Sequence, residues 1–255
     1  MFRPRVIPCL LLQGKGIVKT VQFSEPRYIG DPMNAVKIFN DFDADELVFL
    51  DIDASKEGRS IDVDFVKKVG QEAFMPFAVG GGLRSIQDIR NIFNAGAEKA
   101  VICSSALENP DFITQAAEVF GSQAIVVCID VRTVNGNYRA YTMSGGKKIE
   151  TDVVALAKKL EKLGAGEIII QSIDADGMMS GYDVDLIQLI SAEVRVPVIA
   201  LGGAGELADF TRAVEAGASA VAAGSLFVYA GKNKGILINY PDRSELADLF
   251  VDILK

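Results

Sequence analysis

The sequence repeats one pattern twice, at an offset of 121 residues. Residues 75–84 form a short apolar run that ends in a glycine cluster, and residues 196–205 form a second run of the same kind. Farther along, Ser104 corresponds to Ser225 at that offset. An apolar run bounded by glycines is typical of a buried strand, and a helical pattern follows each cluster. The chain is therefore predicted to consist of two similar halves.

Each half, about residues 1–120 and 121–240, contains four strand-like runs that alternate with helical patterns. Alternation of this kind predicts a parallel sheet, and eight such units in 255 residues fit a closed (β/α)8 TIM barrel. An open doubly wound sheet is the alternative, but duplicated halves with matching glycine turns favour closure. Because a barrel of this length is normally one unit, residues 1–255 are expected to form a single domain.

The composition excludes several function classes. Every apolar run is far shorter than the roughly 20 residues that a membrane helix needs, and the net charge of −8 argues against non-specific nucleic-acid binding. The first strand begins too early for a signal peptide, and three cysteines without paired spacing are typical of a reducing compartment, so a cytoplasmic protein is expected. Since the chain has no histidine, acid–base chemistry must fall to carboxylates, lysines or tyrosines. We expect no metal site and no cofactor.

The two glycine turns predict two anion sites at the carboxyl ends of the strands, where barrel active sites lie. Glycine turns let backbone N–H groups approach a phosphate, and a serine at the end of the next strand can donate a further hydrogen bond. The first predicted site contains Gly81, Gly82 and Ser104, and the second contains Gly202, Gly203, Gly224 and Ser225. The alternative, that the glycines only shape tight turns, is weaker for two matched sites. A ligand with two phosphates would suit this arrangement.

Two aspartates are candidates for acid–base chemistry. Asp130 ends a predicted strand and shares the inward face with Cys128, because strand side chains alternate. Asp176 follows the next strand, although a loop aspartate often only closes a turn. Two carboxylates in environments that separate their pKa values could exchange protons with a substrate.

A charged set falls at the opposite end of the predicted barrel. Two cations and two anions stand at or just before strand starts: Arg5, Glu46, Lys99 and Glu167. Buried charges persist only when they are paired, so these four could close into a neutral ring over the barrel axis and act as a gate. The alternative is four solvated residues at strand starts.

These features together resemble the cyclase subunit of imidazole glycerol phosphate synthase along nearly the whole chain. The motifs that carry the resemblance are residues 7–10, 30–32, 45–51, 79–82, 108–110, 120–123, 164–167, 172–174, 176–177, 180–183 and 202–205. The related duplicated barrel of phosphosugar isomerases fits them less well. The resemblance implies a glutaminase partner at the amino-terminal face, from which ammonia passes through the barrel to a bisphosphorylated substrate.

The same resemblance implies roles for individual residues. The four charged residues match the family's gate, and the glycines and serines of the two turns match its phosphate sites. Asp130 and Lys19 match active-site positions, and Asp176 with Gly177 matches the substrate loop.

One position departs from the family. The family has a catalytic aspartate at the end of the first strand, where this chain has Leu11, the repeat mate of Asp130. A leucine cannot transfer protons. Residues 10–16 and 234–241 resemble the cyclase-like subunits associated with acetamidino-sugar formation in bacterial surface polysaccharides.

The first hypothesis is therefore a barrel that conducts ammonia for amidination of a nucleotide sugar, with a glutaminase and an ATP-dependent amidotransferase as partners. The second is a working cyclase (a lyase) of histidine synthesis, in which Asp176 or Asp51 replaces the missing carboxylate. The third is a scaffold without chemistry of its own. In the third the phosphate sites are vestiges. We expect a phosphorylated small-molecule or nucleotide-sugar ligand and neither a nucleic-acid nor a membrane partner.

Overall fold

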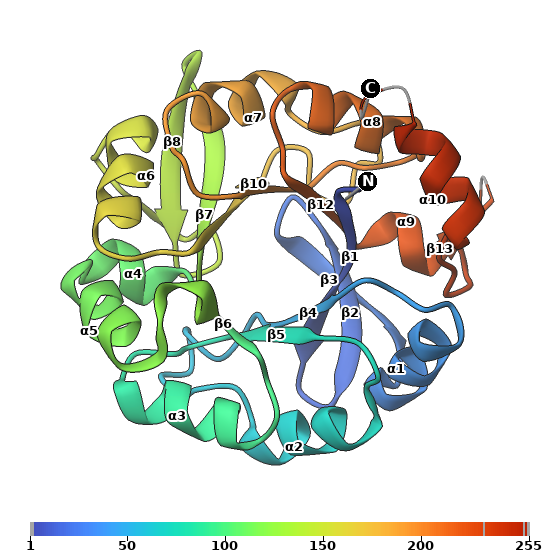
Figure 1. Ribbon diagram of the computed structural model, residues 1–255, viewed down its shortest axis with the longest axis horizontal. Coiled ribbons are helices and arrows are strands. Elements are labelled where there is room, and N and C mark those ends of the chain that lie inside the picture. Colours follow the sequence, from blue (N-terminus) through green and yellow to red (C-terminus); the bar gives the residue numbers. More distant parts are fainter. Residues whose placement is uncertain (1–2, 232, 252, 254–255) are drawn as a thin grey trace.

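A computed structural model describes residues 3–231, 233–251 and 253. Eight parallel strands form a closed ring: they pair in the order β10, β11, β12, β1, β4, β5, β6 and β7, and β10 also pairs with β7. In chain order they are β1 (Arg5–Gln13), β4 (Leu47–Asp51), β5 (Phe77–Gly80), β6 (Lys99–Ile102), β7 (Ile125–Val134), β10 (Glu167–Ser172), β11 (Val198–Leu201) and β12 (Ala220–Ala223). Figure 1 is a view along the axis of this ring and shows the helices outside it. The predicted (β/α)8 barrel is confirmed.

The helices begin where the sequence supplies caps. Asp31 accepts a hydrogen bond from Asn34 N ahead of α1 (Pro32–Asp41), with proline in the first turn. Ser85 and Asp242 form capping boxes at α3 (Ile86–Asn94) and α10 (Arg243–Phe250). The other helices are α2 (Val63–Glu72), α4 (Ser104–Glu108), α5 (Asp111–Phe120), α6 (Val153–Lys162), α7 (Val184–Ser191), α8 (Ala208–Glu215) and α9 (Ser225–Val228), with a 3-10 turn at Ser122–Ala124.

The first connection contains a hairpin. The sequence of residues 12–31 predicts a long loop after the first strand, but β1 continues to Gln13 and a hairpin of β2 (Gly16–Val21) and β3 (Ser24–Gly30) follows. The hairpin turn is Gln22–Phe23, both at positive φ, as two-residue hairpin loops require. The sequence did not predict this hairpin because its turn contains neither an Asn-Gly nor a Gly-Gly pair.

A second hairpin lies within residues 132–148, where the sequence predicts one from its Asn-Gly pair. β7 extends past the barrel and pairs with β8 (Asn137–Thr142), which pairs with the short β9 (Lys147–Lys148). Asn135 and Gly136 turn the chain at positive φ, as the Asn-Gly pair indicated. A smaller hairpin, β13 (Tyr229–Ala230) with β14 (Gly235–Ile236), follows α9.

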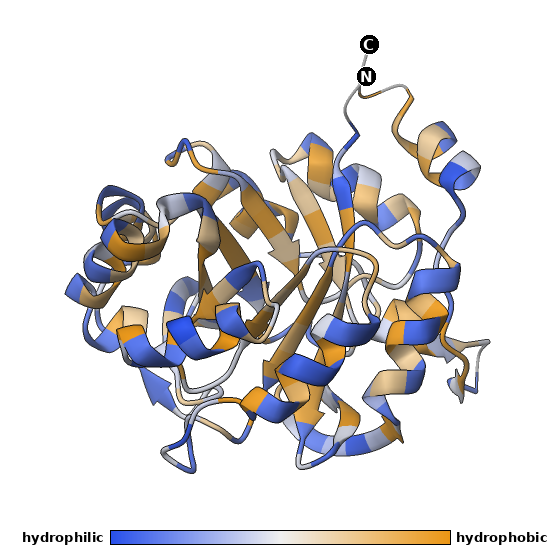
Figure 2. Ribbon diagram, turned by 60° about the horizontal axis from the view of Figure 1, so that its bottom comes forward, coloured by the Kyte–Doolittle hydropathy of each residue, from blue (hydrophilic) through white to orange (hydrophobic). Residues whose placement is uncertain are grey.

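The apolar side chains form two layers. One lies between the strands and the helices, which show apolar inner and polar outer faces in Figure 2. The other fills the barrel interior and includes Cys9 and Cys128 among aliphatic residues. All three cysteines are free. Within the described ranges, no helix has the length and apolarity needed to cross a membrane.

Candidate functional site

Four charged side chains close the amino-terminal end of the barrel. Lys99 Nζ lies 3.0 Å from Glu46 Oε1 and 3.1 Å from Glu167 Oε2, and Arg5 bridges the same two carboxylates. The Glu46 side chain is only 4% exposed and that of Glu167 13%. The predicted ring of charges therefore exists as two cations and two anions, each in contact with both partners of opposite sign. The pairing compensates charges that would otherwise be costly to bury.

The barrel interior above this ring is apolar. Its lining comprises Ile7, Cys9, Val48, Ala78, Val101, Val126, Cys128, Ile169, Ile199, Ala220 and Ala222. Such a lining offers few hydrogen bonds to water or ions, so a small neutral molecule would face the lowest cost in it.

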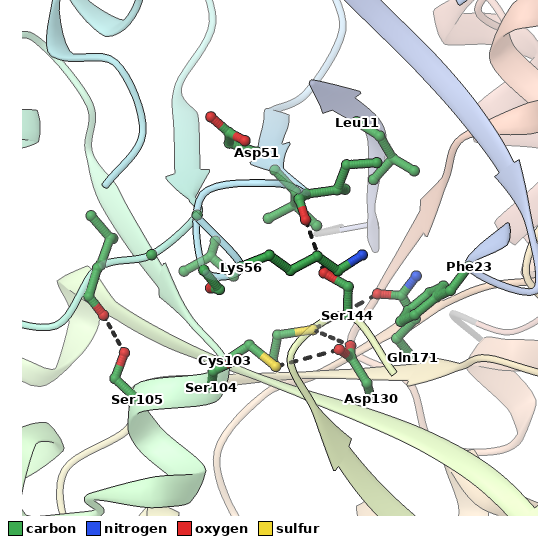
Figure 3. A pocket seen from close by; sticks show the side chains of 18 of the residues that line it. Leu11, Phe23, Asp51, Lys56, Cys103, Ser104, Ser105, Asp130, Ser144 and Gln171 are labelled. Carbon is green, nitrogen blue, oxygen red and sulfur yellow. Dashed lines mark hydrogen bonds between the residues drawn. The ribbon is translucent and has the colours of Figure 1, made fainter. Parts of the chain in front are cut away.

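At the carboxyl ends of the strands, a first pocket contains the first predicted anion site. Gly81, Gly82 and Ser104 line it together with Asp130, and Figure 3 shows its side chains. A Cβ on Gly82 would lie 1.8 Å from the carbonyl oxygen of Arg59, so this position requires glycine for the turn alone. The Ser104 hydroxyl accepts a hydrogen bond from Met143 N at 3.1 Å. The loop after β8 thus already covers one side of the site.

A second pocket contains the second predicted anion site. It is lined by Lys19, Asp176, Gly177, Gly202, Gly203, Gly224 and Ser225. Lys19 is 7% exposed, and its Nζ donates to Cys9 O at 2.9 Å. Across the residues that the structure describes, no carboxylate lies within salt-bridge distance of Lys19. Burial lowers the pKa of Lys19, although Cys9 and Asp176 raise it. A bound anion would supply the missing counter-charge.

Gly224 makes room for that lysine. A Cβ at this position would lie 1.9 Å from Lys19 Nζ. The glycine therefore serves the cation as well as the turn, and the lysine reaches the pocket from β2, far away in sequence.

Asp130 lies in the first pocket and is only 7% exposed. Burial raises its pKa to about 6, although hydrogen bonds from the thiols of Cys128 and Cys103 act in the opposite direction. Near neutral pH both protonation states are therefore accessible, as acid–base catalysis requires.

Asp176 fastens the first hairpin. Its Oδ2 accepts from Thr20 Oγ1 at 2.8 Å and from Phe23 N at 3.4 Å, and its carbonyl accepts from Gln22 N at 2.9 Å. Gly177 packs under the same strand, since a Cβ there would lie 2.1 Å from Thr20 O. Burial raises the pKa of Asp176, while Lys19, Thr20 and Phe23 N–H lower it. Asp176 and Gly177 therefore hold the first hairpin in place, in addition to the substrate-loop role predicted for them.

The carboxylate of Asp51 is hydrogen-bonded within its own loop. Its carboxylate accepts from Arg59 Nη1 at 2.6 Å and from the N–H groups of Asp53 and Ala54 at 3.1 Å each. These hydrogen bonds hold the carboxylate against its own loop, so Asp51 is poorly placed to replace the missing catalytic carboxylate.

The residues at the mouth of the barrel are asymmetric between the halves. Leu11 and Leu50 come from the first half, whereas Asp130 and Gln171 occupy the equivalent positions in the second, and all four line the first pocket. Gln171, 4% exposed, also lines the second pocket and was not predicted. Comparison with Leu50, its mate in the repeat, could have identified it.

Comparison with known proteins agrees with this geometry. A family model described as histidine biosynthesis protein matches residues 5–234. A Vibrio vulnificus protein, provisionally named as imidazole glycerol phosphate synthase subunit hisF3, is 47% identical over 251 residues, which cover 96% of this chain and 95% of that protein. Subunit HisF of the same synthase from Alkaliphilus metalliredigens is 46% identical over 231 residues, covering 90% and 92%.

A Pseudomonas aeruginosa protein, provisionally named as subunit hisF2 of this synthase, is 45% identical over 248 residues, covering 96% of this chain and 99% of that protein. The closed barrel, the extent of the family match and these identities agree with one another. The chain therefore belongs to the histidine biosynthesis protein family and is similar along nearly its whole length to HisF-type subunits of imidazole glycerol phosphate synthase.

Proposed function

We propose that this barrel receives ammonia from a glutaminase docked on its amino-terminal face and passes it to a phosphorylated substrate at the mouth. The observation that carries the proposal is the ring of Arg5, Glu46, Lys99 and Glu167 below an apolar interior that ends at Asp130. HisF subunits work with a glutaminase partner in the synthase complex, which fits this direction of transfer. Neutral ammonia can cross an apolar interior at a much lower free-energy cost than the ammonium ion, whose charge would be buried without a partner.

The reaction that the comparisons favour is the cyclase reaction of imidazole glycerol phosphate synthase. The relatives carry that enzyme's name, and none of the names above mentions a sugar or a polysaccharide. The cyclase therefore takes first place, ahead of the sugar amidination that the sequence alone ranked first.

In this proposal the two pockets bind the two phosphates of the substrate. Lys19, Gly203 and Ser225 would hold one phosphate, with the buried cation supplying charge. Gly82 and Ser104 would hold the other. Asp130, whose ionised and protonated forms are both accessible near neutral pH, would exchange a proton with the substrate.

Amidination of a nucleotide sugar is the second candidate, and Leu11 favours it. The first half places Leu11 where the second places Asp130, and its carboxylate in the same pocket, Asp51, is bound to Arg59. In this candidate the barrel delivers ammonia to an ATP-dependent amidotransferase, which activates the acetamido group.

Two measurements separate these candidates. The first asks whether the chain stimulates a co-purified glutaminase, and the second whether its gene restores growth of a histidine auxotroph that lacks the cyclase. Stimulation with growth supports the cyclase. Stimulation without growth supports delivery to another enzyme, and the absence of both would leave the scaffold hypothesis.

A further inference from the structure

Two thiols converge on the carboxyl group of Asp130. Cys103 Sγ lies 3.4 Å from Oδ2, and Cys128 Sγ lies 3.4 Å from Oδ1. Figure 3 shows both sulfur atoms beside the carboxylate at the base of the first pocket. The strands dictate this arrangement: Ile102 pairs with Val127, so the next residues, Cys103 and Cys128, lie side by side. Cys128 in turn shares a strand face with Asp130.

The two thiols are the groups that donate hydrogen bonds to the side chain of Asp130. Over residues 3–231, 233–251 and 253, no N–H or O–H group donates to its side chain and no cation forms a salt bridge with it. A carboxylate can only accept hydrogen bonds, and each S–H can donate one, although weakly.

The other groups around Asp130 do not stabilise its charge. Gln171 on β10 and Tyr141 on β8 are its register partners. Asp176 raises its pKa by repulsion, and the exposed Lys56 and the ion-paired Asp51 line the same pocket without contacting it. Leu11 and Leu50 complete an apolar wall.

Both thiols remain protonated and so able to donate. The hydrogen bond with Cys103, burial and Asp130 raise the pKa of Cys128 well above its ordinary value. The hydrogen bond with Cys128 lowers the pKa of Cys103, but burial and Asp130 outweigh it and the pKa is raised. These thiols are therefore donors rather than nucleophiles.

We propose that Cys103 and Cys128 are positioning residues, which orient the carboxyl group of Asp130 toward the pocket and favour its ionised form. Because none of the described cations forms a salt bridge with this buried carboxylate, hydrogen bonds to the charged form are the means left to oppose desolvation. The inference deepens the proposed function, on which the catalytic meaning of Asp130 rests.

The internal repeat supports a role tied to the carboxylate rather than to packing. Under the repeat, Asp130, Cys128 and Cys103 correspond to Leu11, Cys9 and Gly224, so the strand pair β6–β7 corresponds to the strand pair β12–β1. The space beside Gly224 holds Lys19 Nζ, 1.9 Å from where a Cβ would stand. Of these two equivalent strand pairs, only β6–β7, where Asp130 stands, carries both thiols.

The test follows the side-chain carboxyl carbon of Asp130 by NMR in the whole chain, between about pH 4 and pH 9, and assigns it with Asp130→Asn. Cys103→Ala and Cys128→Ala should each raise the titration midpoint by about half a pH unit, the effect expected for loss of one weak donor. Cys103→Ser keeps a donor and should leave the midpoint at or below the native value. Cys9→Ala, an interior thiol that does not touch Asp130, should not move it.

An unchanged midpoint in the alanine variants would overturn the proposal, and so would equal shifts in Cys103→Ala and Cys103→Ser. Should Cys128→Ala fail to fold, the two Cys103 variants decide. The midpoint is measured without substrate or partner, so it stands even if the cyclase assay fails. If turnover with ammonium is detected, its acidic limb should shift upward with the midpoint in the same variants.

Discussion

Leu11 and Asp130 line one pocket from equivalent positions of β1 and β7, the first apolar and the second a buried carboxyl group. The strands that carry them come from the two halves of the repeat, and their backbones occupy corresponding places in the barrel. The difference therefore lies in the side chains. It concentrates acid–base chemistry in the second half of the chain.

Replacing this leucine tests whether a second carboxylate restores the family's pair. Leu11→Asp should raise turnover of the cyclase substrate with ammonium by tenfold or more, because it adds a proton-transferring group opposite Asp130. It should also lower the free energy of unfolding by about 2–4 kcal/mol, since a buried leucine is lost and a polar group is buried. Leu11→Asn is the matched control, and equal turnover in the two variants would contradict the prediction.

The raised pKa of Asp130 makes a pH-dependent contribution to stability. Its folded pKa is about 6 and its ordinary value 3.8, so between these values the folded state binds more protons and its stability falls as the pH rises. Asp130→Asn removes this loss. The variant should be more stable than the native chain at pH 7 by up to about 3 kcal/mol, and close to it near pH 4.

Urea unfolding of both chains at several pH values measures this difference. A gap that does not grow between pH 4 and pH 6.5 would show that the Asp130 pKa is not raised in the folded state.

The ring of charges should be sensitive to loss of one cation. Lys99→Met leaves two nearly buried carboxylates with Arg5 as their remaining partner. We expect a loss of about 2 kcal/mol in the free energy of unfolding, less than for a fully buried pair because Arg5 remains. Lys37→Met is the control: Lys37 and Glu72 form an exposed pair 4.0 Å apart, and the cost should stay below about 0.5 kcal/mol. Similar costs in both variants would mean that the ring is solvated.

An exposed phenylalanine marks the surface where the proposal puts the glutaminase. Phe74 is 88% exposed and precedes β5, which lies between β4 and β6 in the barrel. Phe42, 39% exposed, precedes β4 at the same end. Phe74→Ser should weaken glutaminase binding at least tenfold, as expected for a large aromatic at an interface, without loss of stability. Leu237→Ser removes an exposed side chain on the small hairpin after α9 and should not change binding. Calorimetric titration of the two subunits compares them; equal affinities would place the interface elsewhere.

Part of the candidate site could be predicted because it depends on local pattern. Asp130 was identified from strand alternation, and Gly82 and Gly203 from the turns that follow strands. The four charged residues of the ring, Lys99 among them, were identified from their positions at or just before strand starts, which barrel closure then brings together. Their contacts follow directly from the closed parallel topology.

Other features required the packed molecule. The thiol of Cys103 reaches Asp130, and Asp176 holds the tip of the first hairpin, through contacts between segments remote in sequence. Asp51, a possible substitute acid in the sequence, is bound to Arg59.

The sequence by itself determined the barrel, its repeat and the asymmetry of Leu11 against Asp130, because periodicity and glycine spacing are local and survive in one dimension. Only the tertiary structure decided which polar groups are free and which are engaged, because a side chain's partners depend on loops that meet across the mouth. The protonation of Asp130 belongs to this second class, since burial and two neighbouring thiols set it.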